Sequence, residues 1–431
     1  MRYRKEPIRA SEEEKTVVVP LREEEDGVVS RSFGFACRGT LACGGYGAER
    51  LAGFETLPQG ETAAAIYRVG TGQAAAVLAC CRGGSVYVGI NGGGLAKSAV
   101  TFSMPPAAAR VFDGQEGVLL SDGAACALLT AGGLQKEEDI PPFSGAAYAH
   151  ERLWLLSSEK SDRLLFSAPA DIRDFSESRG TGGRIDLPDA KGKIAALCAF
   201  GGDLYLFRER GVQRLRARGD ERDFEITDVF DCCGIYPKTA AAAPFGIAWL
   251  AKDGLYRFDG NRCARVPLPF RFAEEQAGAQ AVAAEFGYVL SARIAAEKGE
   301  ADAVCVSEDG ESCVVLPFGG EGLTSCAGEA YFVRQGEPAA LRKRFVRGCA
   351  SRWASAPVRP FGKRARLSRV RICADGAFWL EVRADGRKRG FLITGNQTAA
   401  VNLAGEEFAF ALESDGAGRI ASIEAAFTAG G

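Results

Sequence analysis

Carboxylates are the residues of this sequence that could most readily do chemistry. Glycoside hydrolases place two carboxyl groups on either side of a sugar bond, at a separation fixed by the mechanism. No spacing in this sequence selects such a pair, because Asp is also an ordinary residue of solvated turns. A carbohydrate-active enzyme or carbohydrate-binding protein therefore remains an alternative. The aspartates in predicted loops are Asp162, Asp171, Asp174, Asp220, Asp223, Asp228 and Asp231.

Other catalytic and metal-binding patterns are poorly represented. His150 is the only histidine, so a Ser-His-Asp triad would have to pass through it, and its place just before "RLWLL" predicts a turn residue. The glycine clusters at 44–53 and 89–94 lack the Lys-Ser/Thr of a phosphate loop. The 14 cysteines include no CxxC pair and lie mostly within apolar stretches, which predicts buried thiols. We expect no catalytic residue, no metal and no cofactor.

Basic residues are concentrated in one part of the chain. The protein as a whole is balanced, with 53 Lys and Arg against 55 Asp and Glu, but residues 342–371 hold eleven Lys or Arg and no acid. Such a run could contact DNA phosphates, or its cations could be distributed over strand faces and bind a partner protein. We favour the protein interface. The candidate interface residues are Arg342, Lys343, Arg344, Arg347, Lys363, Arg364, Arg366, Arg369 and Arg371.

The elements that would position these residues are strands. Segment 200–219 predicts a hairpin, with a solvated turn at Arg208–Arg210, and segments 149–169 and 244–261 repeat its pattern. Successive repeats are separated by 32 to 51 residues, close to the roughly 40–50 residues of a four-stranded propeller blade. The frequent alanines suit strands that crowd a propeller axis. One central strand residue per repeat gives Tyr87, Leu119, Trp154, Tyr205, Trp249, Tyr288 and Tyr331.

These patterns predict an all-β chain in three parts. Residues 1–60 are expected to form an extended arm that packs on another element or completes the last blade. Residues 61–350 are expected to form a β-propeller of six or seven blades. Residues 351–431 are expected to form a small antiparallel β-sandwich, since short alternating strands follow Pro357 and Pro360 at hairpin spacing.

The sequence shows no targeting feature. The N-terminal segment has charges but no apolar core of the secretory type, and no apolar stretch is long enough for a membrane helix. We therefore expect synthesis in a cytoplasm and no membrane span.

Several segments, in this order, resemble structural proteins of tailed bacteriophages. The glycine-rich segment 35–58 is similar to their opening, and segments 192–215 and 232–260 follow the order of their central strands. The C-terminal part from Trp353 is similar to their final module. The resemblance covers about half the chain, 148–260 and 350–431. Its most specific motif is a hairpin with Arg152, Leu153, Trp154, Arg163, Leu164, Phe166, Ser167 and Phe175.

The resemblance implies a non-enzymatic component of a phage tail or head–tail connection, encoded by a prophage. Such a protein would be made in a bacterial cytoplasm and would reside in the virion after assembly. Its partners would be other virion proteins, with contact to DNA through residues 342–371 as a further possibility. The family implies no catalytic residues for this chain.

Overall fold

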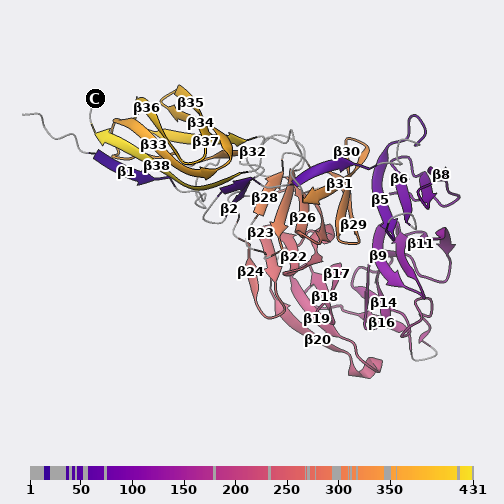
Figure 1. Ribbon diagram of the computed structural model, residues 1–431. Coiled ribbons are helices and arrows are strands. Elements are labelled where there is room, and N and C mark those ends of the chain that lie inside the picture. Colours follow the sequence, from indigo (N-terminus) through magenta and orange to yellow (C-terminus); the bar gives the residue numbers. More distant parts are fainter. Residues whose placement is uncertain are drawn as a thin grey trace, which may run out of the picture. The chain divides into compact units, whose positions relative to one another are not determined.

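A computed structural model shows an all-β protein (Figure 1). Within the described part of the chain the regular elements are strands, with only single-turn 3₁₀ helices at Glu221–Asp223 and Pro237–Thr239. No helix among those residues is long and apolar enough to cross a membrane. The structure describes residues 14–19, 35–37, 41–43, 46–51, 57–71, 75–177, 181–231, 234–266, 268, 272–276, 278–293, 302–308, 310, 313–316, 319–343, 351–355, 357–414 and 418–429.

The chain forms two compact units. We call the first the seven-sheet unit; it takes most of the chain from Gly47 to Lys343. We call the second the two-sheet unit; it is built from parts of the chain that lie before and after the first. Each unit has its own buried apolar core, and the two are described separately.

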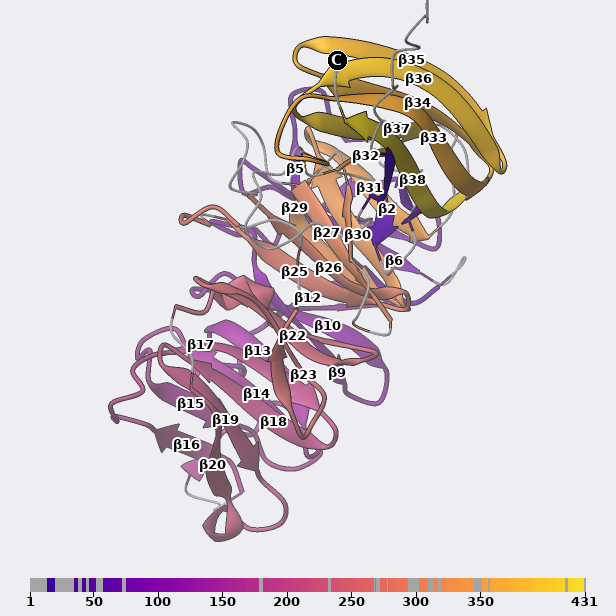
Figure 2. The same cartoon turned by 90° about the vertical axis from the view of Figure 1, so that its left-hand side faces the viewer.

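The seven-sheet unit contains, in its described residues, seven antiparallel sheets of four strands each (Figures 1 and 2). Consecutive strands pair with one another, as expected for alternating segments joined by short glycine turns. The first four sheets are β5–β8 (Ala63–Val69, Ala76–Cys81, Val86–Ile90, Ala96–Lys97), β9–β12 (Ala107–Phe112, Glu116–Ser121, Cys126–Thr130, Gly133–Glu137), β13–β16 (Phe143–Ala149, Arg152–Ser157, Arg163–Phe166, Gly183–Asp186) and β17–β20 (Ile194–Phe200, Asp203–Arg208, Gly211–Arg216, Glu225–Phe230).

The remaining three sheets follow the same pattern, with one exception. The last sheet takes its fourth strand, β4, from the chain that precedes the first sheet. Leu51, directly after β4, donates a backbone hydrogen bond to Pro338 O at 3.1 Å. The strands are β21–β24 (Ala241–Ala243, Gly246–Ala251, Gly254–Phe258, Cys263–Arg265), β25–β28 (Gln280–Ala284, Gly287–Ala292, Asp302–Ser307, Cys313–Leu316), and β29–β31 (Glu321–Cys326, Glu329–Arg334, Glu337–Lys343) with β4 (Tyr46–Arg50).

Neighbouring sheets pack through their first strands and through apolar side chains between their faces. Strands β9 and β13, β13 and β17, and β25 and β29 are in contact. The series closes on itself, because β29 also contacts β5, and Thr324 Oγ1 donates to Ile66 O at 2.5 Å. Several of these first strands are rich in alanine, as β5, β9 and β21 show. This arrangement is that of a β-propeller.

The predicted repeat residues are distributed one to a sheet. Six of the seven lie on the second strand of their sheets, for example Trp154 on β14 and Trp249 on β22. Tyr87 is the exception, because it lies on the third strand, β7. Leu78 of β6 is the corresponding second-strand residue, and its separation of 41 from Leu119 removes the shortest interval in the series.

The two-sheet unit has two antiparallel sheets that share one apolar core. One sheet has the order β2-β3-β38-β33-β36, with β1 also paired to β38; the other has the order β32-β37-β34-β35. The core includes the fully buried Trp353, Phe408 and Phe427. The strands are β1 (Glu14–Val18), β2 (Phe35–Cys37), β3 (Leu41–Cys43), β32 (Ser351–Ala354), β33 (Ala365–Asp375), β34 (Ala377–Ala384), β35 (Arg387–Thr394), β36 (Gln397–Gly405), β37 (Phe408–Ser414) and β38 (Arg419–Ala429).

Strand β1 pairs the N-terminal part of the chain with the two-sheet unit, and the residue after it enters the core. It runs along β38, with Glu14 opposite Thr428 and Val18 opposite Glu424. Val19, which follows β1, is fully buried, and its N–H donates to Ile423 O at 2.9 Å. The N-terminal segment thus contributes strands to both units, since β4 belongs to the last four-stranded sheet.

Candidate interaction surface

Three of the predicted interface residues share one face of β33. Arg366, Arg369 and Arg371 are exposed, whereas the intervening Leu367 and Val370 are buried. A bulge between Leu367 and Arg369 shifts the register by one residue, which keeps all three guanidinium groups on the outer face of the sheet. We call Arg366, Arg369 and Arg371 the arginine row.

The arginine row is only loosely neutralised. Arg369 Nη2 lies 3.4 Å from Glu14 Oε1, and Arg371 Nη1 lies 3.9 Å from Glu424 Oε2. Both pairs are exposed, so solvent screens them and they contribute little to stability. Arg366 Nη2 donates to the amide oxygen of Asn402 at 3.4 Å. The guanidinium groups can therefore exchange these partners for acceptors on another molecule.

The rest of the predicted basic run is not part of this face. Lys363 and Arg364 are exposed in the turn before β33. Arg342 and Lys343 end β31, which belongs to the seven-sheet unit, and Arg344 and Arg347 lie outside the described residues. The run that is continuous in sequence is thus divided between two units.

The predicted loop aspartates mainly organise turns and ion pairs. Asp220 accepts a hydrogen bond from Arg222 N, and Asp171 accepts one from Arg173 N, as turn-forming aspartates do. The structure brings two of them together: Asp228 and Asp231 lie 3.2 and 2.7 Å from Lys191 Nζ.

The environment of Asp228 favours its charged form. The amide of Gln213 donates to it at 3.0 Å, and this bond, together with Lys191, lowers the pKa of Asp228 against the opposing effect of burial. A carboxyl group whose pKa is lowered is a poor proton donor at neutral pH.

His150 lies in the turn between β13 and β14, where its φ is +55°. Burial lowers the pKa of its imidazole, an effect that the nearby Asp203 opposes. At neutral pH the ring is therefore mainly uncharged.

The structure corrects the expectation for Arg208. The turn Arg208–Arg210 was predicted to be solvated, but Arg208 is completely buried, while Glu209 and Arg210 are exposed. Its guanidinium donates to Gly192 O at 3.0 Å, to Leu187 O at 2.9 Å and to Asp189 Oδ1 at 2.8 Å. The side chain also bonds Gln213 Oε1 at 2.8 Å, so it ties the loop before β17 to β18 and β19.

Arg152 of the "RLWLL" motif has a similar role. It is buried and donates to Ser167 O at 2.8 Å and to Gly219 O at 3.3 Å. Its guanidinium also lies 5.5 and 5.6 Å from the rings of Phe166, in β15, and Phe224, which directly precedes β20 of the next sheet. The motif that carries the family resemblance thus links one sheet to the next.

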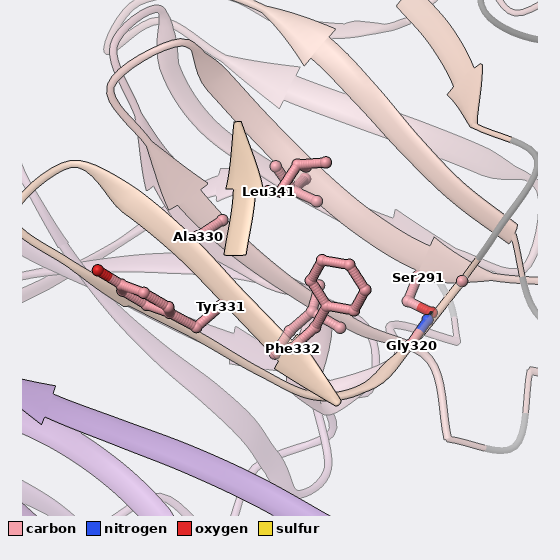
Figure 3. A pocket seen from close by; sticks show the side chains of 9 residues that line it. Ser291, Gly320, Ala330, Tyr331, Phe332 and Leu341 are labelled. Carbon is pink, nitrogen blue, oxygen red and sulfur yellow. Dashed lines mark hydrogen bonds between the residues drawn. The ribbon is translucent and has the colours of Figure 1, made fainter. Parts of the chain in front are cut away.

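A small pocket lies between the last two sheets of the seven-sheet unit (Figure 3). Its lining is mainly apolar, with Phe332, Leu341 and Ala330 among the residues that form it. The Tyr331 hydroxyl points away from the pocket (Figure 3) and accepts a hydrogen bond from Arg68 Nη1 at 3.1 Å. Ser291 Oγ accepts from Gly320 N at 3.4 Å. The pocket presents little polar chemistry to a ligand.

One exposed aromatic side chain was missed in the sequence. Trp379 of β34 is 46% exposed and lies opposite the exposed Leu392 of β35. The alternation of "AFWLEVRA" gives the signal, because Phe378 and Leu380 face the core and Trp379 between them must face outward.

Comparison with known proteins finds similarity at the level of structure. No family model matches the sequence, and no curated protein matches it. Similar solved structures include streptogramin B lyase, with 12% identity over 69% of this chain and 98% of that chain and a TM-score of 0.46.

Two further examples are β-propeller proteins, as the lyase is. BamB from Moraxella catarrhalis has 12% identity over 69% of this chain and 96% of that chain, with a TM-score of 0.36. A putative gluconolactonase has 14% identity over 68% of this chain and 97% of that chain, with a TM-score of 0.36. At this distance the neighbours assign no activity to this protein.

Proposed function

We propose that this chain is a non-enzymatic structural protein of a phage tail or head–tail connection, made in a bacterial cytoplasm and assembled into the virion. The observation that carries the proposal is the arginine row: three exposed cations on one strand face, with only loose ion pairs. Electrostatic complementarity of this kind guides a protein to an acidic partner surface. The resemblance of the "RLWLL" hairpin and the C-terminal strands to phage proteins supplies the class of partner.

We further propose how the architecture serves this role. The seven four-stranded sheets would be the seven blades of a closed propeller spanning residues 61–350, with β4 of the 1–60 arm completing the last blade. The two sheets around Trp353 would be a β-sandwich of residues 351–431 joined by β1. The N-terminal segment would thus contribute strands to both the propeller and the sandwich.

The proposal can be tested in particles from the bacterial strain that encodes the chain. After prophage induction, particles are purified by density gradient and their proteins identified by mass spectrometry. We expect the chain to co-purify with particles in a fixed ratio to the other virion proteins. Particles that assemble and infect without the chain would overturn the proposal.

The partner of the arginine row needs a separate test. Charge-reversal variants of Arg366, Arg369 and Arg371 are compared for incorporation into particles and, in parallel, for binding to duplex DNA. Loss of incorporation without a change in DNA binding supports a protein partner. A salt-dependent affinity for DNA that falls with each substitution would instead assign the row to nucleic acid.

A further inference from the structure

Trp379 lies on the solvent-facing side of the sheet β32-β37-β34-β35, with its ring against the neighbouring strand β35. The ring of Trp379 lies over Gly390 of β35: a Cβ at position 390 would be 2.3 Å from Trp379 Cζ2. Glycine at this position therefore allows the indole to lie along the strand. Trp379 remains 46% exposed, whereas Trp154, Trp249 and Trp353 are essentially buried.

Polar groups lie on both sides of this ring. Glu381, two residues along β34, accepts from Arg383 Nε at 2.5 Å, and its second oxygen lies 3.3 Å from Lys388 Nζ. On the other side, the exposed Glu413 of β37 is directly opposite Trp379. The contacts with Glu381 hold Arg383 and Lys388 close to the strands on which they lie. We call Trp379, Glu381, Arg383, Lys388 and Glu413 the tryptophan platform.

The hydrogen bonds around Glu381 fix its charge as well as its position. Burial would raise the pKa of Glu381, but the bonds from Arg383 and Lys388 outweigh burial and lower it. The carboxylate is therefore ionised at neutral pH, and it orders the two cations beside the ring. A preordered set of side chains loses less conformational entropy when a ligand binds.

We propose that the tryptophan platform binds a neutral oligosaccharide, with a pyranose ring stacked on Trp379 and its hydroxyl groups bonded to the flanking side chains. The C–H face of a pyranose is apolar and matches an exposed indole, whose body is apolar. Sugar hydroxyls both donate and accept, and the platform offers two carboxylate acceptors and two cationic donors.

The charged residues around Trp379 favour a neutral sugar over a polyanion as the ligand. By strand register, Glu381 and Glu413 are the charged residues nearest the ring, and the cationic positions Arg383, Lys388 and Arg352 lie beyond them, so the immediate surroundings of the ring do not attract a polyanion. Carboxylates on both sides of the ring would repel the phosphates of a nucleic acid stacked there. The proposal is independent of the proposed virion function, which rests on the arginine row of the other sheet.

Tryptophan fluorescence offers a direct test, because Trp379 is the one exposed tryptophan among the four of the chain. The full-length protein is titrated with cellohexaose, laminarihexaose, maltohexaose, chitohexaose and mannohexaose, and acrylamide quenching is measured with each. We expect at least one sugar to protect the emission from quenching. The proposal is overturned if none protects it at concentrations up to about 10 mM, or if only oligothymidylate or a polyglutamate peptide does.

Variants assign the binding to the platform. By calorimetry, Trp379→Ala should lower the affinity for the protecting sugar by about tenfold or more, as loss of an aromatic stacking partner does. Phe112→Ala is the control, since Phe112 is also an exposed aromatic residue but lies in the seven-sheet unit. Equal affinities of Trp379→Ala and wild type, with both proteins folded by circular dichroism, would contradict the proposal.

Conservative changes separate stacking from hydrogen bonding. Trp379→Phe should retain part of the affinity, and Glu381→Gln should lower it by about threefold to tenfold, because a neutral amide holds Arg383 and Lys388 less firmly. Virion assembly should be unchanged in all three variants. Loss of sugar binding with intact assembly would separate the two functions, and unchanged sugar binding in Glu381→Gln would remove that residue from the site.

Discussion

Two buried arginines of the seven-sheet unit and three exposed arginines of the two-sheet unit have opposite roles. In the seven-sheet unit, Arg152 and Arg208 are buried and donate to backbone carbonyl groups of neighbouring loops and strands. In the two-sheet unit, Arg366, Arg369 and Arg371 are exposed, and their acidic neighbours lie at 3.4 Å or more. A guanidinium group stabilises the fold where its N–H groups bond to acceptors within the protein. Where its N–H groups face solvent, it is available to a partner.

The physical reason is the cost of desolvating a charge. A buried guanidinium must replace its water with several hydrogen bonds, and Arg208 does so with two carbonyl groups, Asp189 and Gln213. An exposed guanidinium keeps its water, so its ion pairs contribute little. Removal of the two kinds of arginine should therefore affect different properties.

The largest loss of stability is expected for Arg208→Met. The variant leaves Gly192 O and Leu187 O without their donor and the charge of Asp189 without its partner, which should cost about 3–5 kcal/mol. Urea unfolding of the seven-sheet unit, followed by circular dichroism, measures the change. The adjacent exposed Arg210→Ala is the control and should change stability by less than about 0.5 kcal/mol. Equal midpoints for the two variants would contradict the structural role of Arg208.

A somewhat smaller loss is expected for Arg152→Met. The substitution removes three backbone hydrogen bonds and the contacts with the rings of Phe166 and Phe224, although methionine retains part of the packing. We expect a loss of about 2–4 kcal/mol in the free energy of unfolding. The same urea titration measures it, with the exposed Arg218→Ala in place of Arg210→Ala as the control. A loss within experimental error would show that the guanidinium does not link the two sheets.

An intermediate case is the pair of Arg163 and Asp186, whose effect should depend on pH. Two hydrogen bonds, at 2.7 and 3.0 Å, join them, and these bonds hold the pKa of Asp186 well below its usual range. The pair therefore stabilises the protein above the unfolded-state pKa of about 4, and this contribution is lost as the pH falls through the lower folded-state pKa.

Urea midpoints at several pH values test this pair. Asp186→Asn should be less stable than wild type at neutral pH, and the difference should shrink as the pH falls below about 4. A difference that stays constant down to the lowest pH would show that Asp186 is not ionised more readily in the folded protein.

The smallest effect on stability is expected for the arginine row. Replacing Arg366, Arg369 and Arg371 together by Gln should change the free energy of unfolding by less than about 1 kcal/mol, because only exposed and distant ion pairs are lost. Thermal unfolding at low and high salt measures this. A large, salt-dependent loss of stability would show that these arginines, like Arg152 and Arg208, stabilise the fold.

Much of the fold could be predicted from local sequence. Alternating apolar residues and glycine turns indicated the four-stranded sheets, and the hairpin of β18 and β19 lies within the segment 200–219 where it was expected. Tyr87 lies one strand later in its sheet than the other six repeat residues do in theirs, because β6 and β7 are both apolar and only their pairing distinguishes them.

The roles of individual charges could not be predicted in the same way. Burial of Arg208 depends on Asp189 and Leu187, which come from a loop about twenty residues earlier, and nothing in "FRERG" indicates that loop. The division of the basic run between two units depends on where the chain leaves β31, which local patterns do not reveal. Trp379, by contrast, could have been recognised from the alternation of its strand.

The most direct measurement is the incorporation of the triple variant Arg366→Gln, Arg369→Gln, Arg371→Gln into phage particles, relative to wild type. We expect a variant that folds with wild-type stability but is depleted from purified particles by about tenfold or more, as loss of an interface hot spot would cause. Incorporation at the wild-type level would contradict the assignment of this face as the contact surface.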